Sequence, residues 1–263
     1  SEMCIRDSIG NNGIIYGTPY FTATPKQVRD NESDTYILGE VGNSAEFVDF
    51  NPTKGLLGFK NARGIELFSI PEGRILGTLN SLTTRITALK FSPDGESLLI
   101  SGADSMIYNW RFAAQFNGEE SGRSERLLHR YVGAGSIPSA LAYHPQGRVF
   151  FSGDWRGDLV TWQRYGIGKY EGKYDKNYSG DRFFTGKSIR VRSRVGNGVG
   201  IDKLQIDETG QFLFVGLQDG SLEVWKIKGM QPVTSLKVHD GPIYSLSVRG
   251  PGTLLATAGK DGH

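Results

Sequence analysis

A pattern that recurs about every forty residues constrains the fold of this chain more than any other feature of its sequence. Each copy consists of an apolar strand, a short turn that ends in glycine, and a second apolar strand. The five copies occupy 46–55 (EFVDFNPTKG), 86–95 (ITALKFSPDG), 138–147 (PSALAYHPQG), 201–210 (IDKLQIDETG) and 243–252 (IYSLSVRGPG). The last residues of their first strands lie 41, 52, 63 and 42 residues apart. Two intervals match a four-stranded unit of roughly 40–45 residues, and the two longer ones indicate inserted loops.

A strand-end aromatic residue gives a second landmark in the first four copies. It lies 18 or 19 residues after the end of the first strand, at Phe68, Trp110, Trp162 and Trp225. The residues before it alternate in polarity, as in 221–225 (SLEVW), which is typical of a strand with one packed face. A single small sheet cannot bury both of its faces, whereas sheets stacked around an axis cover one another. The sequence therefore predicts an all-β fold of the β-propeller type.

Three local features make the chain similar to the WD-repeat family. The turn at 91–95 (FSPDG) has the commonest first-turn sequence of that family, and 238–243 (VHDGPI) resembles its histidine-containing loop before a blade. Two aspartates lie six residues before strand-end tryptophans, namely Asp104 before Trp110 and Asp219 before Trp225. The resemblance extends from about residue 13 onward, and it implies that the repeats are propeller blades.

The resemblance also implies structural roles for several polar and aromatic residues. In the family, a buried histidine, a strand hydroxyl, a turn aspartate and the tryptophan form a hydrogen-bonded chain. His239, Thr257 and Asp261 stand at the first three of these positions in the last copy. The same comparison assigns structural roles to Asp104, Trp110, Trp162, Asp219 and Trp225. Ala62 and Arg156 replace the aspartate in two copies, so these blades are expected to depend more on packing.

The spacing of the repeats predicts the domain organisation. We expect four nearly complete four-stranded blades, at about 45–81, 86–132, 138–194 and 201–238, between partial blades at about 13–41 and 243–260. Together they would form an open arc, an incomplete ring, within residues 9–263. Residues 1–8 (SEMCIRDS) resemble a translated sequencing adapter, and we interpret them as a non-native scar. The tryptophan of the last copy would fall beyond His263, so we expect an internal fragment of a longer protein, cut at both ends.

Composition narrows the classes of function. The net charge of +2 gives no global field that would favour nucleic acid or a membrane. No apolar run approaches the roughly 20 residues of a membrane-spanning helix. The lone Cys4 excludes a disulfide framework and a cysteine-based metal site. No signal peptide is visible, which favours the cytoplasm.

The sequence also lacks the motifs of common enzymes. The four histidines are far apart, and neither a nucleophile elbow nor a phosphate-binding loop is present. A propeller enzyme would need channel-facing carboxylates or histidines from several blades, whereas the inner strands are mostly apolar. We therefore predict a protein that is not an enzyme and that uses no cofactor and no metal.

Long insertions follow the third strand of three blades, at 22–34, 113–126 and about 165–187. In the family this connection lies on the face opposite the loops that lead into each blade, so the inserts are expected on one face. Such inserts often mark a binding side, and neutral variation at tolerant loops is the alternative.

The insert within 164–194 holds nine basic residues against three acidic ones, with tyrosines and phenylalanines between them. Its candidate partner-binding residues are Tyr170, Lys173, Tyr174, Lys176, Tyr178 and Arg182. Basic residues interleaved with aromatics can grip a polyanion or form a protein hot spot. The remaining interpretation is a solvated β-extension whose tyrosines pack on one another.

The opposite face offers a second candidate, Trp155 with Arg156. They lie in the turn between a second and a third strand, where the family exposes residues that contact partners. A tryptophan beside an arginine is typical hot-spot chemistry. The alternative is that Trp155 only covers the turn of a neighbouring blade.

These observations favour a non-catalytic scaffold that presents a rigid surface to partner proteins. One alternative is a propeller that binds a polyanion or a small ligand through the basic insert. The other is the sensor or regulatory part of a larger enzyme. No motif in the sequence identifies the partner.

Overall fold

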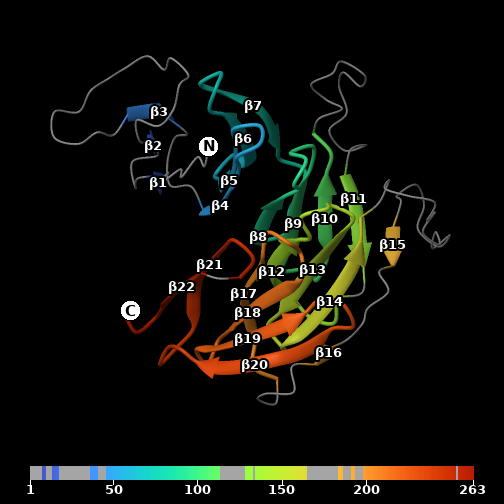
Figure 1. Cartoon of the computed structure of the whole chain (residues 1–263). Coiled ribbons are helices and arrows are strands. Elements are labelled where there is room, and N and C mark those ends of the chain that lie inside the picture. The colour runs from blue at the N-terminus through green and yellow to red at the C-terminus, as the bar shows by residue number, and fades with distance from the viewer. Residues whose placement is uncertain are drawn as a thin grey trace. The chain divides into compact units, whose positions relative to one another are not determined.

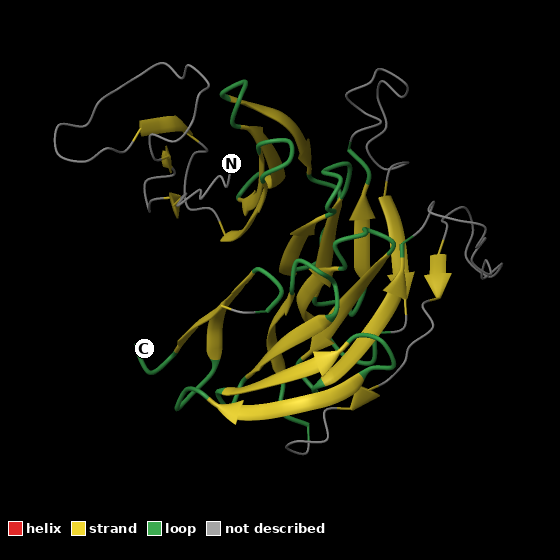
Figure 2. Ribbon diagram, in the orientation of Figure 1, coloured by secondary structure: helices red, strands yellow, loops and turns green. Residues whose placement is uncertain are grey.

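The computed structural model describes residues 8–9, 14–17, 36–40, 46–112, 128–132, 134–164, 183–185, 191–192, 198–252 and 254–263. Every regular element in these residues is a β-strand, as the all-β prediction requires (Figure 1, Figure 2). The chain divides into two compact units, Ser1–Thr83 and Thr84–His263. None of the described residues forms a helix that could span a membrane.

The first unit holds a four-stranded antiparallel sheet in chain order. Its strands are β4 (Glu46–Asn51), β5 (Leu56–Asn61), β6 (Gly64–Ser69) and β7 (Arg74–Leu79). Leu57, Phe59 and Phe68 form its buried core. This sheet occupies the segment where the repeat pattern predicts the blade at about 45–81.

A second sheet of this unit has three strands. It contains β1 (Ser8–Ile9), β2 (Ile14–Gly17) and β3 (Tyr36–Glu40), in that order. Strands β2 and β3 lie within the partial blade expected at about 13–41, and β1 lies before it. The additional strand forms because the backbone of Ser8 and Ile9 pairs with that of Tyr16 and Ile15.

The second unit repeats the same antiparallel meander. One sheet contains β8 (Ile86–Phe91), β9 (Leu98–Gly102), β10 (Ile107–Trp110) and β11 (Leu128–Val132). The next contains β12 (Pro138–Tyr143), β13 (Val149–Asp154), β14 (Asp158–Gln163) and β16 (Val191–Arg192). It is followed by β17 (Ile201–Ile206), β18 (Phe212–Leu217), β19 (Ser221–Lys226) and β20 (Gln231–Lys237), and then by β21 (Ile243–Arg249) and β22 (Leu254–Gly259). These sheets lie side by side in chain order (Figure 1).

One strand of this unit departs from the meander. Strand β15 (Phe183–Thr185) comes from the insert at about 165–187 but pairs in parallel with β11 of the preceding sheet. The repeat pattern treats this insert as a loop, and nothing in its sequence indicates the pairing. The insert therefore connects two blades through the edge of a sheet.

A β-bulge near the start of the first strand recurs in five sheets. The register shifts lie at Glu46/Asp49, Ile86/Ala88, Pro138/Ala140, Ile201/Lys203 and Ile243/Ser245. A bulge bends its strand and increases its twist. The same distortion at the same place shows that the sheets are structural repeats and not only repeats of sequence.

Neighbouring sheets of the second unit are joined through their first strands. The Thr87 hydroxyl donates to the Pro138 carbonyl oxygen at 2.5 Å, and the Ser139 hydroxyl donates to the Ile201 carbonyl. Each hydroxyl belongs to the second residue of the first strand of its sheet. It bonds to the first residue of the first strand of the next sheet. Apolar side chains fill the space between the sheets, in clusters around Trp162 and Trp225.

The loops of the second unit gather at the two ends of its sheets. We call one end the loop face; it comprises 84–85, 103–106, 134–137, 155–157, 198–200, 218–220, 238–242 and 260–263. On this face the residue after each second strand donates its backbone N–H to the residue before the first strand. These pairs are Ala103 to Arg85, Trp155 to Ile137, Gln218 to Gly200 and Lys260 to Pro242, at 2.8–3.3 Å. The opposite end, which we call the insert face, carries the first turns, such as 92–97 and 144–148; the inserts expected at 22–34 and 113–126, and most of that at 165–187, lie outside the described residues.

Candidate interaction surface

Trp155 is an exposed tryptophan in a chain whose other tryptophans are buried. Its side chain is 42% exposed, against 0%, 1% and 3% for Trp110, Trp162 and Trp225. It lies on the loop face, directly after β13. Leaving a large aromatic surface in water is unfavourable, so an exposed indole on a well-ordered turn is a typical anchor for a partner.

The turn that carries Trp155 is held from several sides. Its own N–H bonds to the Ile137 carbonyl at 3.3 Å. Asp154 Oδ1 accepts the N–H groups of Arg156 and Asp158, at 2.8 and 2.9 Å. Gly157 has φ of 79°, and a Cβ there would lie 2.5 Å from the Val199 carbonyl oxygen. These contacts fix the backbone of the turn, and a fixed backbone loses little ordering entropy in any binding event.

Arg85 adds a basic group from the preceding sheet. Its guanidinium carbon lies 5.7 Å from the centroid of the Trp155 ring, within the range of a cation–π contact. The contact shows that Trp155 does reach the neighbouring blade, as the alternative interpretation expected. Trp155 nevertheless remains 42% exposed, so the contact with Arg85 leaves much of its surface accessible.

Asp154 lies beneath this surface and is itself buried, at 3% exposure. Its Oδ2 has no hydrogen-bond partner in the described part of the chain. Burial raises the pKa of the Asp154 carboxyl above its ordinary value, although the two N–H groups that Oδ1 accepts act in the opposite direction. Its role here is to hold the turn, because Oδ1 accepts two of the N–H groups of that turn.

The second candidate surface is the basic insert. Tyr170, Lys173, Tyr174, Lys176, Tyr178 and Arg182 lie outside the described residues. Arg164, which opens the same basic stretch, is described and does not face solvent. It is 6% exposed and pairs with Asp94 of the preceding sheet. The count of basic residues in the sequence therefore included one that serves the fold.

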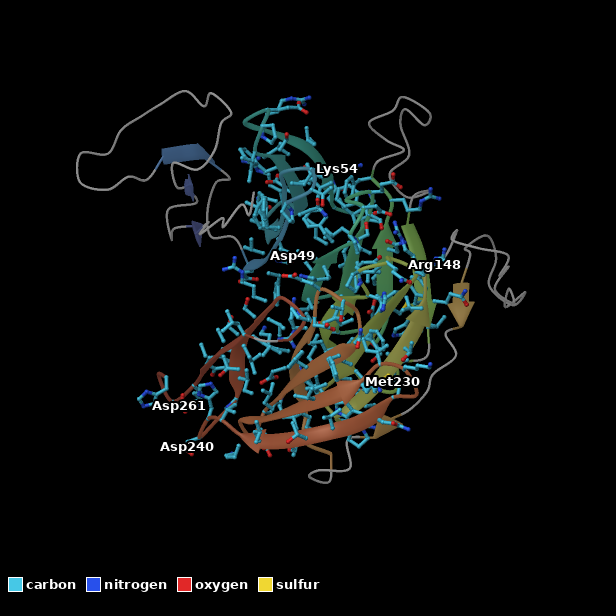
Figure 3. All side chains as sticks on the ribbon, viewed as in Figure 1. Asp49, Lys54, Arg148, Met230, Asp240 and Asp261 are labelled. Carbon is cyan, nitrogen blue, oxygen red and sulfur yellow. The ribbon has the colours of Figure 1, made fainter. Side chains whose placement is uncertain are left out.

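On the loop face of the last sheets, His239 connects two turns. Its Nδ1 lies 3.0 and 3.1 Å from the carboxylate oxygens of Asp261, and its Nε2 lies 2.9 Å from Thr257 Oγ1. Since the carboxylate accepts, Nδ1 carries the proton and Nε2 accepts from the threonine hydroxyl. The Asp240 N–H donates to Asp261 at 3.0 Å. The two residues are labelled near each other in Figure 3.

These hydrogen bonds also stabilise the charge of Asp261. The N–H of Asp240, together with the N–H of His263 and the His239 ring, lowers the pKa of its carboxyl to about 2. Behind the imidazole, a Cβ on Gly259 would lie 2.5 Å from the ring, so the strand end needs glycine. The arrangement joins the loop at 238–242 to the turn after β22, and it is a structural connection.

Comparison with known proteins agrees with this geometry. The family model described as "WD domain, G-beta repeat" matches residues 73–111 and 230–263. The second match contains the complete His239–Thr257–Asp261 arrangement. Residues 73–111 and 230–263 are WD repeats.

Curated relatives share the repeats at low identity. Pre-mRNA-processing factor 19 of rice (Oryza sativa subsp. japonica) is 24% identical over 82% of this chain and 36% of its own length. Pre-mRNA-processing factor 19 homolog 2 of Arabidopsis thaliana is 23% identical over 74% of this chain and 32% of its own. The ribosome biogenesis protein WDR12 homolog of Chlamydomonas reinhardtii is 31% identical over 36% of this chain and 23% of its own. The chain thus spans about a third of the length of the first two relatives.

In the other blades, the indole N–H groups of the tryptophans differ in their hydrogen-bond partners. Trp162 Nε1 donates to Ser152 Oγ at 2.8 Å, and Trp225 Nε1 donates to Glu223 Oε2 at 2.8 Å. Trp110 is equally buried, but its Nε1 has no hydrogen-bond partner among the described residues. Within the described residues, therefore, only the last WD repeat shows the linked histidine, hydroxyl and aspartate.

The two turn aspartates also differ in their bonds. Asp104 accepts the Tyr108 hydroxyl at 2.5 Å and the Met106 N–H at 3.1 Å. Asp219 accepts the N–H of Ser221 at 2.8 Å. Both therefore shape their own turns, which is a structural task.

Sequence reasoning missed three residues of these sites. Arg85 carried no signal, because its relation to Trp155 depends on two separate sheets. Asp154 could have been noticed as the one charged residue of its strand, Val149–Asp154. Glu223 stands two residues before Trp225, on the inward face of its strand, and Glu66 stands likewise before Phe68, where Asn61 donates to it at 2.7 Å. That repetition in the sequence could have indicated a buried carboxylate at both places.

Groups of three or more His, Cys, Asp or Glu side chains that could hold a metal ion are absent from the described residues.

Proposed function

We propose that this chain is a non-catalytic protein-interaction scaffold and that the Trp155 turn is where a partner docks. The observation that carries the proposal is the exposed Trp155 indole on a turn that neighbouring segments fix on several sides. Rigid, exposed aromatic and arginine side chains contribute most of the binding energy in many protein interfaces.

The WD-repeat family supports the scaffold part of the proposal, because WD-repeat proteins generally serve as platforms for protein interaction. The relatives are named for pre-mRNA processing and for ribosome biogenesis. These are different processes, so what supports our proposal is the shared architecture and not one of the named processes.

The proposal can be tested by quantitative affinity capture with the full 263-residue chain. We expect Trp155→Ala and Arg156→Ala each to lose the same set of captured proteins. Arg148→Gln, an exposed substitution on the insert face, is the matched control and should lose none of them. Equal melting temperatures of the variants would show that the fold is retained. If the captured set is unchanged by Trp155→Ala, the docking site is elsewhere and this proposal is wrong.

A further inference from the structure

The geometry points to the kind of partner that the Trp155 turn accepts: an acidic segment of a protein, in which carboxylates flank an apolar side chain. This inference rests on the proposed function and names the chemistry of its partner. The surface consists of Arg85, Trp155 and Arg156.

Two exposed guanidinium groups accompany the indole. Arg85 approaches the ring at 5.7 Å, and Arg156 follows Trp155 directly in the turn. Neither side chain has an ion pair or a hydrogen bond in the described part of the chain. Exposed arginines that make no ion pair, on a fixed backbone, are complementary to carboxylates and can bind them with two parallel hydrogen bonds.

The nearby carboxylates of Asp104 and Asp154 form no ion pair with Arg85 or Arg156. Asp104 is occupied by Tyr108 and Met106, at 2.5 and 3.1 Å. Asp154 is buried and uses Oδ1 to hold the turn. Hydrogen bonds hold the Asp104 and Asp154 carboxylates in their own turns, whereas the two exposed arginines are the groups that can pair with a carboxylate of a partner and raise its rate of association.

The apolar component comes from the indole itself. The side chain is 42% exposed while Arg85 lies against the ring, so much of its surface is available to a second side chain. An apolar residue between two carboxylates would cover this surface while its neighbours reach the arginines. The ion pairs with the arginines would not bind a partner strongly without the contact to the indole, because exposed ion pairs contribute little in water.

The basic character is also local. Farther along the loop face, at 218–220, 238–242 and 260–263, three aspartates accompany a single lysine, Lys260, and Lys237 donates to the Asp219 carbonyl. Asp240 and Asp261 lie together at the end of this face (Figure 3). A long polyanion would need a continuous basic track, whereas a short acidic segment needs only the pair of arginines.

A direct test measures the binding of one defined probe by fluorescence anisotropy. The probe is a labelled peptide of sequence Asp-Glu-Asp-Leu-Phe-Asp-Glu-Asp, and its matched control has Asn and Gln in place of the acids. We expect saturable binding of the acidic peptide only, weakened about three- to fivefold by Arg85→Gln and by Arg156→Gln. Trp155→Ala should abolish it, and Arg148→Gln should leave it unchanged.

Trp155 provides an independent measurement on the same variants. Because the other tryptophans are buried, quenching by small solutes reports mainly on this indole. Iodide, an anion, should quench it more strongly than caesium does, and each arginine substitution should reduce this preference. Quenching by neutral acrylamide should stay the same, which shows that the ring remains exposed.

Three outcomes would overturn the inference. The first is equal binding of the two peptides, and the second is no saturable binding of the acidic peptide. The third is that single-stranded oligouridylate binds more tightly than the acidic peptide and that this binding depends on Arg85 and Arg156. If protein capture still depends on Trp155 in any of these cases, the docking proposal stands and only the acidic partner is wrong. If capture and peptide binding are both insensitive to Trp155, both are wrong.

Discussion

Two nitrogens of the Arg164 guanidinium donate hydrogen bonds to the Asp94 carboxylate of the preceding blade. Nη1 lies 2.6 Å from Oδ2, and Nη2 lies 3.3 Å from Oδ1. Arg164 follows β14 and is 6% exposed, while Asp94 lies in the turn after β8. The ring of Tyr143 and the hydroxyl of Ser97 complete its surroundings, at 5.8 and 3.1 Å. The pair joins two blades on the insert face, where His144 and Glu208 make similar links to Gly210 and Gly250.

Substituting Asp94 and substituting Arg164 should lower the free energy of unfolding by different amounts. We expect Asp94→Ala to lower the free energy of unfolding by about 2–3 kcal/mol, because a buried guanidinium loses its counter-charge. Arg164→Met should lower it by only about 1 kcal/mol, because methionine fills much of the space and buries no charge. Urea unfolding of both variants checks this, with Arg148→Gln as an exposed control. Equal losses would show that the ion pair does not govern this joint.

The buried tryptophans offer a matched comparison of hydrogen bonding. Trp162→Phe and Trp225→Phe remove an N–H that Ser152 and Glu223 accept, whereas Trp110→Phe removes one without a partner among the described residues. All three lose similar volume. We therefore expect Trp110→Phe to cost about 1–2 kcal/mol less in unfolding free energy than the other two. The same urea titrations measure this, and a larger loss at Trp110 would contradict it.

Asp154 should make the fold less stable as the pH rises. Its pKa is raised in the folded state, so folding favours the protonated form, and stability falls as the pH rises above the ordinary aspartate range. Asp154→Asn keeps an oxygen for the two turn N–H groups and removes the buried charge. We expect this variant to melt above the wild type at pH 7, with a smaller difference at pH 4.

Asp154→Ala is the control for that experiment. It removes the acceptor that Arg156 and Asp158 use, so it should melt below Asp154→Asn at both pH values. If the two variants melt at the same temperature, the hydrogen bonds of Oδ1 do not stabilise the turn.

Asp261 should show the opposite dependence on pH. Its pKa of about 2 lies below the ordinary value of 3.8, so its contribution is complete above about pH 4 and is lost as the pH falls toward 2. Hydrogen exchange of the amides in β21 and β22 should therefore accelerate over this interval in the wild type. Asp261→Asn should exchange faster already at pH 7 and show a smaller acid response. An identical acid response in both proteins would exclude Asp261 as its cause.

Much of the fold is encoded in short stretches of sequence, and this is why it could be predicted. In the turn at 91–95, Ser92 donates to Asp94 at 2.6 Å, and Gly95 takes a φ of 64° that few other residues tolerate. Such contacts span only a few residues, so the sequence shows them directly. The exposure of Trp155 is similar, because its place in a tight turn after a second strand keeps it from the interior.

The parts that were missed depend on residues far apart in the chain. Arg85 meets Trp155 only because two blades pack together, and β15 joins β11 only because the chain after β14 returns to the preceding sheet. Nothing near either residue in the sequence marks these relations. The basic insert shows the same limit, since counting charges could not reveal that Arg164 is buried.

By itself, the sequence determined that this chain forms small antiparallel sheets of the WD type, because strand polarity and turn chemistry act between near neighbours. It also determined the His239–Thr257–Asp261 positions, through residue types at fixed spacing. Only the tertiary structure decided which charged side chains became interior ties and which stayed at the surface. Arg164 and Arg156 are alike as sequence, but packing between blades places Arg164 against Asp94 and leaves Arg156 exposed beside Trp155. Burial and partner distance are properties of that packing, and they separate a structural arginine from one that can bind.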